Sequence, residues 1–192
     1  MMLFDMRVGE QMDNRRKVMI AFLIIGIPLF IWIQFFEVPS KVKIGEEKLQ
    51  QDSTTHEFEK VTQYESPYMG DASNVINLLN ELPLNQYKGK IELDPDTLSL
   101  LVNYDIHSTE IEHQAKQGVI YNSTAMFALI ENIQQINMKF KDKTYSVSRD
   151  RVEKWFGTTL VDFKDPKVFK EKVQNPLNED FSAWFDAYTE EE

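Results

Sequence analysis

The chain has 192 residues, of which 42% are hydrophobic and 12% aromatic, so it can form one domain of ordinary size with an additional segment. It contains no cysteine, which excludes a disulfide framework, thiol catalysis and cysteine-type zinc or iron–sulfur sites. The formal net charge of −10 argues against a nucleic-acid partner, because binding to phosphates depends on lysine and arginine side chains.

Residues 18–36 form the most distinctive segment of the chain. They are 19 residues without a charge, and 16 of them are apolar. A helix of this length extends about 28 Å, close to the thickness of the hydrocarbon core of a bilayer. The sequence therefore predicts a transmembrane helix that holds the chain in a lipid bilayer.

The charges on either side of this segment predict its orientation. Three basic residues precede it, Arg15, Arg16 and Lys17, whereas the first charge after it is Glu37. By the positive-inside rule, residues 1–17 form a cytoplasmic tail and the rest of the chain is extracytoplasmic at the cell membrane. The apolar run exceeds that of a secretory signal peptide and no A-x-A-like site follows it, which favours an uncleaved signal anchor over a cleaved signal peptide.

The exported part divides into a linker, a domain and a tail. Residues 37–65 are polar, with isolated apolar residues at no persistent spacing, and we expect a stalk in which His56 is exposed. Regular apolar periodicity begins at Ser66, so a folded domain is expected over 66–188. A frayed acidic tail is expected over 189–192.

The apolar spacing of this domain predicts helices and strands. In chain order they are a helix over 71–82, strands over 90–93 and 98–104, a helix over 120–133, strands over 136–140 and 144–147, and short helices over 149–156, 166–173 and 178–188. No element is predicted over 107–118. Helices that are separate from hairpins are typical of the α+β class, so we expect helices on one face of a small sheet of antiparallel hairpins.

Cap residues predict where the helices begin and end. The candidate N-caps are Asp71 or Ser73 for the first helix, one of Asn122, Ser123 and Thr124 for the second, Ser148 for the helix over 149–156 and Asp165 for that over 166–173. Gly157 lies in the position that glycine favours after a helix C-terminus.

Three segments carry a resemblance to a known family. They are Ser66–Asp71 with Asn74 and Leu78–Pro83, Val102–Tyr104, and Ile120–Ile133. Over about residues 64–160 the chain resembles DUF4825, a bacterial domain of unknown function that occurs largely in Firmicutes, often behind a single N-terminal membrane span. Ser123 and Met126 depart from the family pattern, where alanine and leucine are expected. The resemblance implies an exported, membrane-tethered domain and supplies no catalytic residue.

The most site-like stretch contains Tyr68, Gly70, Asp71 and Asn74, because a glycine before a capped helix leaves amide groups that can hold an anion. The favoured alternative is structural. In it Gly70 permits a turn, Asp71 caps the helix and Tyr68 packs beneath it.

Other candidate sites are weaker. The carboxylates Glu92, Asp94, Asp96 and Asp105 could hold a pair of the glycosidase type, although such residues more often form turns. His107 and His113 are six residues apart, which does not fit a helical pair of metal ligands, so no metal or cofactor is expected. Four aromatic residues at helical spacing are expected to pack on their own core, with a patch for a partner as the alternative: Phe181, Trp184, Phe185 and Tyr188.

These features predict a single-pass membrane protein whose extracytoplasmic α+β domain is a non-catalytic binding or sensing module for an envelope protein or a small ligand. The alternative is an envelope enzyme that acts on a small or cell-wall substrate through the carboxylates near Glu92–Asp105. A third possibility is a structural assembly part, with Gly26 and Pro28 at a helix–helix contact.

Overall fold

The computed structural model describes residues 4–33, 35 and 45–191, and the chain divides into two units, 1–47 and 48–192. The first unit contains helix α1 (Phe4–Trp32), which has Pro28 inside it. Among the described residues, no helix combines the length and the apolar character needed to cross a membrane. The remaining parts of the expected membrane helix and stalk, at residues 34 and 36–44, lie outside the described residues.

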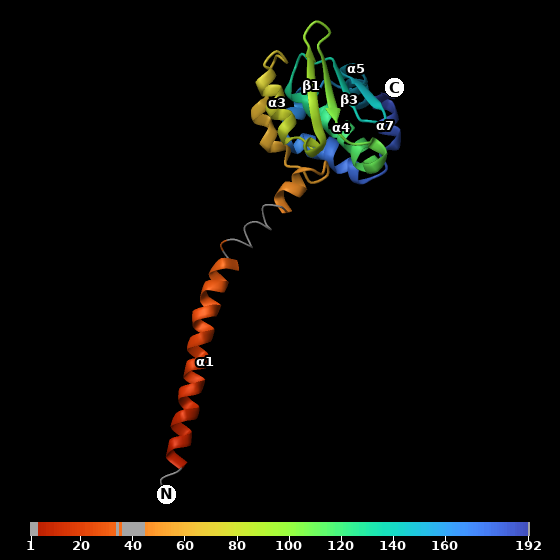
Figure 1. The fold of residues 1–192 in the computed structure, drawn as a ribbon. Helices are drawn as coiled ribbons and strands as arrows, with labels where there is room; N and C mark the ends of the chain where they lie inside the picture. The colour runs from red at the N-terminus through yellow and green to blue at the C-terminus, as the bar shows by residue number, and fades with distance from the viewer. Residues whose placement is uncertain (1–3, 34, 36–44, 192) are drawn as a thin grey trace. The chain divides into compact units, whose positions relative to one another are not determined.

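The second unit is built around a five-stranded sheet in the order β1-β2-β3-β4-β5 (Figure 1). The strands are β1 (Lys88–Asp94), β2 (Ser99–Tyr104), β3 (Gln135–Lys139), β4 (Thr144–Ser148) and β5 (Thr189–Glu191). β2 and β3 are parallel, and the other neighbours are antiparallel. The two predicted antiparallel hairpins, β1–β2 and β3–β4, are therefore confirmed. They join through the parallel pair of β2 and β3, which was not predicted, because a long helix follows β2 and allows β3 to run in the same direction.

Helices and short turns make up the rest of this unit. The helices are α3 (Ala72–Glu81), α4 (Glu112–Leu129), α5 (Arg149–Phe156), α6 (Pro166–Phe169) and α7 (Ser182–Tyr188). The short segments are the 3-10 turns η2 (Phe58–Tyr64), η3 (Asn85–Tyr87), η4 (Ser108–Ile111), η5 (Val161–Lys164) and η7 (Asn175–Asn178), and the π-turn η6 (Lys170–Gln174). The α+β class is confirmed.

Strand periodicity positions one face of the sheet in the core. Leu100, Val102 and Tyr104 of β2 are buried, and the residues between them are half-buried. On β4, the ring of Tyr145 meets Phe185 of α7 edge-on, with ring centres 5.3 Å apart. This alternation is what the sequence predicts for a sheet with one covered face.

Helix α4 forms the centre of the core, since all of its residues from Gln117 to Leu129 are buried. It begins at Glu112, eight residues before the predicted start. The prediction missed its first turns because they are charged and exposed. The expectation that residues 122–124 cap it is therefore wrong. Ser123 and Thr124 lie within the helix, where their hydroxyls donate to backbone carbonyls of the preceding turn.

The other caps are as predicted. Asp71 accepts from a backbone amide at the start of α3, and Ser148 and Asp165 do the same for α5 and α6. Gly157 follows α5 with φ of 67°, in the left-handed region that glycine favours.

Residues 48–65, which we expected in an exposed stalk, belong to the folded unit instead. Phe58 and Val61 of η2 are buried, since they are three residues apart and point to the same side of the turn. His56 is only 3% exposed. The apolar residues of this segment are too few to show a period, yet Phe58 and Val61 enter the core and Tyr64 packs against it, whereas Leu49 stays exposed.

The end of the chain also differs from the expectation of a frayed tail. Residues 189–191 form β5, which pairs with β4 through Val147 and Thr189. Arg151 of α5 stabilises this strand by donating to the Thr189 carbonyl at 3.4 Å and by pairing with Glu190. Residue 192 lies outside the described residues.

A largely buried arginine, Arg149, closes the C-terminal end of α4. The guanidinium of Arg149 donates to the carbonyls of Phe127, Ile130 and Ile133 at 2.9, 2.9 and 2.8 Å. It also lies 5.1 Å from the centre of the Phe127 ring. The positive charge therefore satisfies carbonyls that the helix leaves unpaired, at the negative end of the helix dipole.

Candidate functional site

The predicted site at the start of α3 is a capped helix end. The Asp71 carboxylate accepts from the amide of Asn74 at 3.1 Å. The Asn74 side chain donates to the Tyr64 carbonyl at 2.6 Å, which ties α3 to η2. The carboxylate thus occupies the position that a bound anion would take.

The residues just before this cap are also held by internal hydrogen bonds. The amide of Met69 donates to the side chain of Asn132 at 2.7 Å, and Met69 itself is buried. Tyr68 is 68% exposed, so it does not pack beneath α3 as expected. Gly70 has no atom within 4 Å of the position that a Cβ would take. The structure brings Asp71 and Asn74 together and leaves Tyr68 in solvent.

Of the four candidate carboxylates near the β1–β2 turn, Glu92 and Asp94 have local partners. Glu92 pairs with Lys90 at 3.0 Å. Asp94 accepts from backbone amides of the turn, and hydrogen bonding to Thr97 lowers its pKa. A general acid of the glycosidase type needs a raised pKa. Asp105 lies against Gly89, with its Oδ2 3.0 Å from the position of a Cβ there. These geometries are typical of turns and strand ends.

The two histidines near η4 have different neighbours. His107 Nδ1 lies 2.9 Å from the Glu110 carboxylate. His113 faces the ring of Phe181, with ring centres 5.2 Å apart. In the part of the chain that the structure describes, no group of three or more histidine, aspartate and glutamate side chains could hold a metal ion.

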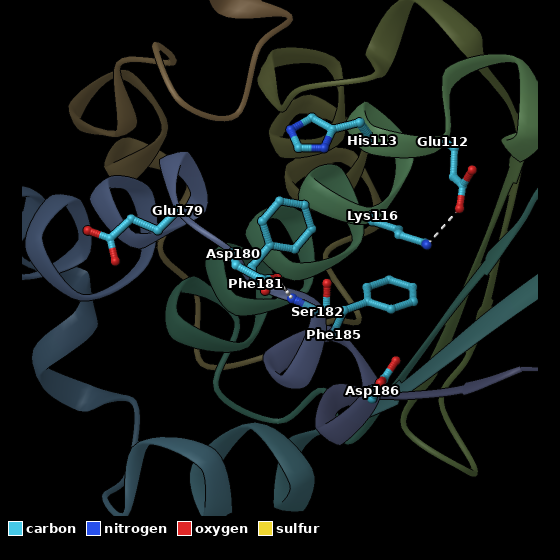
Figure 2. A pocket seen from close by; sticks show the side chains of 9 residues that line it. All are labelled: Glu112, His113, Lys116, Glu179, Asp180, Phe181, Ser182, Phe185 and Asp186. Atoms are coloured by element: carbon cyan, nitrogen blue, oxygen red, sulfur yellow. Dashed lines mark hydrogen bonds and ion pairs between the residues drawn. The ribbon is translucent and has the colours of Figure 1, made fainter.

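A hollow of about 440 Å³ lies between the first turns of α4 and the segment that leads into α7 (Figure 2). Phe181 and Phe185 line it, and both side chains are largely buried. The predicted aromatic stripe therefore packs on its own core, as expected, since Trp184 and Tyr188 are buried too. Of these four side chains, Phe181 and Phe185 are the ones that line the hollow.

Charged side chains surround these rings. Lys116 Nζ is 2.7 Å from Glu112 Oε1 and 5.6 Å from the centre of the Phe185 ring. This hydrogen bond raises the pKa of Lys116 and lowers that of Glu112, so both are charged at neutral pH. Asp180 accepts from the amide of Ser182 at 3.0 Å, which lowers its pKa.

Two further carboxylates line the same hollow. Figure 2 shows Asp186 near Phe185, whereas Glu179 extends away from both rings. Among the described residues, neither of them forms an ion pair with a basic nitrogen within 4 Å, and the same holds for Asp180. Because Lys116 and Glu112 neutralise each other, the hollow has a net negative charge.

Sequence reasoning missed this hollow because it predicted no element over 107–118. A signal was present, since Glu112 and Lys116 have the i, i+4 spacing of a helical ion pair. The approach of this turn to residues 179–186 depends on tertiary packing and leaves no sequence pattern.

Comparison with known proteins identifies one family. Residues 61–150 match DUF4825, a domain of unknown function. This match confirms the resemblance and includes β1 to β4 and all of α4, but it ends before α7. Neither a curated protein nor a solved structure matches the chain.

Proposed function

We propose that this chain, whose residues 61–150 belong to the DUF4825 family, is a membrane-anchored, non-catalytic binding module. Residues 18–36 anchor it in the cell membrane, with residues 1–17 in the cytoplasm and the folded unit outside. The support is physical. The large apolar side chains described between Val18 and Phe35 are 42% to 74% exposed, and such a surface needs lipid or a partner to cover it.

The observation that carries the binding function is the hollow between α4 and α7. Carboxylates without a basic partner line it together with Phe181 and Phe185, and the Lys116 ammonium lies 5.6 Å from the centre of the Phe185 ring. A ligand with a positive charge on an apolar stem fits this chemistry, because carboxylates attract the charge and aromatic rings accept both parts. The ligand class is therefore an organic cation, either a free amine or a basic peptide side chain.

Labelling in intact cells tests the anchoring. The chain has no native cysteine, so single cysteines can be introduced at exposed positions, Asn14→Cys and Tyr68→Cys. A membrane-impermeant maleimide should label Tyr68→Cys in intact bacterial cells and Asn14→Cys only after lysis. Labelling of Tyr68→Cys only after lysis would contradict the proposal.

Calorimetric titration of the full-length chain in detergent tests the binding. The probes are spermidine and a short peptide with one arginine, which represent the two sources of organic cations. Asp186→Asn should weaken binding by about two- to five-fold, the effect of one exposed ion pair. Glu179→Gln makes the same change in charge on a side chain that extends away from the rings, and it should have a smaller effect. Equal losses in both variants, or no binding of either probe, would exclude this site.

A further inference from the structure

Residues 48–57, called the strap below, are where the chain enters the folded unit. The strap has no helix or strand of its own beyond residue 50, and side chains from distant elements hold it. Gln174 of η6 donates to the carbonyls of Ser53 and His56 at 3.1 and 2.7 Å. Gln51 donates to the side chain of Asn85 at 2.8 Å. The strap is therefore docked mainly by a few polar contacts.

Residues of the strap line two hollows. One of about 510 Å³ is lined by Gln51, Asp52 and Thr55 together with Tyr87. The other, of about 490 Å³, is lined by His56 and by residues of α6 and η6. The strap thus has open space beside it into which it can move, and His56 is at the edge of that space.

His56 is the buried polar contact that docks the strap to two helices. Its Nδ1 lies 2.7 Å from the Tyr121 hydroxyl of α4, and its Nε2 lies 3.0 Å from the Glu81 carbonyl of α3. A carbonyl only accepts, so Nε2 carries the hydrogen and Nδ1 accepts from the hydroxyl. This arrangement fits the neutral imidazole.

A protonated His56 lacks a counterion in this position. The titratable and charged groups around it are Tyr121 of α4, Glu57, Glu59 and Lys60 of its own segment, and Lys170 of η6. Glu57 already pairs with Lys60 at 3.1 Å. Burial lowers the pKa of His56 to about 4 and outweighs the hydrogen bond to the Glu81 carbonyl, which raises it; the opposite effects of Lys60 and Glu57 are smaller.

We propose that the strap is an acid-sensitive latch, in which protonation of His56 releases residues 48–57 from the folded unit. In the released strap the imidazolium is hydrated, so acid favours the open state over the docked one. With a pKa of 6.5 in the open state and about 4 in the docked state, the open population rises by about 20-fold between about pH 7 and about pH 5.

The consequence is a longer tether. Ten extended residues span at most about 33 to 36 Å. Where residues 18–36 are anchored as proposed above, acid thus increases the reach of the domain. The release of the strap itself does not depend on the anchor or on the hollow at α7, so its test is independent of both.

Hydrogen exchange of the full-length chain in detergent tests the latch, with rates corrected for the intrinsic exchange rate at each pH. The strap should lose about 20-fold protection between about pH 7 and about pH 5, relative to α4 residues 119–129. His56→Gln should abolish this pH dependence. Gln174→Leu removes two hydrogen bonds to the strap and keeps His56, so it should lower protection at both pH values and retain the ratio.

Three results would overturn the proposal. They are equal strap protection at both pH values in the unmodified chain, an equal loss in the strap and in α4, and a pH dependence that persists in His56→Gln. Because the first two are read from the unmodified chain, the test remains decisive even where His56→Gln fails to fold.

Discussion

Replacing Arg149 by methionine should destabilise the folded unit far more than the loss of a surface charge. The side chain is 13% exposed and donates to three carbonyls around the C-terminal end of α4. Methionine has a similar length but no donor, so these carbonyls lose their charged partner. Each hydrogen bond to a charged group contributes about 1.5 to 3 kcal/mol, and relief of the desolvation cost of the guanidinium offsets part of the sum. We expect a net loss of about 2 to 4 kcal/mol in the free energy of unfolding.

Urea unfolding of the full-length chain in detergent, followed by tryptophan fluorescence, measures this loss. Trp155 and Trp184 are stacked with ring centres 5.8 Å apart, so their emission should report on unfolding of the unit. Arg151→Met is the matched control. Arg151 also donates to carbonyls and pairs with a carboxylate, but its side chain is 37% exposed and its loss should cost less than about 1 kcal/mol. Similar losses in the two variants would refute the argument from burial.

Three further variants test other parts of the packing. Gly118→Ala should lower the free energy of unfolding by about 1 to 3 kcal/mol despite the better helix propensity of alanine, because the new Cβ would lie 2.3 Å from Leu84 Cδ1. Thermal melting followed by circular dichroism measures this loss, and an unchanged melting point would contradict it. Asp71→Ala removes the cap of α3 and should lower the free energy of unfolding by about 1 kcal/mol, which the same thermal melting measures. Burial raises the pKa of Asp142, but hydrogen bonds from Ser108 outweigh this and lower it to about 2. The stability that the ionised Asp142 contributes is therefore fully present above its ordinary pKa of 3.8 and is lost as the pH falls towards 2. The melting point of Asp142→Asn should accordingly fall less than that of the unmodified chain over this pH interval.

Local patterns were sufficient for most helices and strands of the second unit. Asp71 and Ser148 act within three residues of their own position, which is why the caps could be predicted from spacing. The start of α4 could not be predicted in this way, because its first turns are charged and only its later turns are apolar. The parallel pairing of β2 with β3 depends on the path of that helix, which no strand pattern contains.

The polar contacts that hold the unit together were beyond sequence reasoning. His56 and Tyr121 are 65 residues apart in the chain, and each residue alone resembles many exposed histidines and tyrosines. The same is true of the hollow at α7, where residues 112–116 meet residues 179–186. The predicted site at Asp71 could be found in the sequence because its residues are close together in the chain. The same short-range contact, from the Asn74 amide to the Asp71 carboxylate, makes it a helix cap.

The order of strands in the sheet has a consequence for folding kinetics. Every strand pairs with the strand next to it in the sequence, but residues 149–188 separate β4 from β5, so β5 can reach β4 only once this segment has packed. Until then the backbone groups on the outer side of β4 have no partner and can pair with another unfinished chain. Slow docking of residues 149–188 would therefore lengthen the period in which aggregation competes with productive folding.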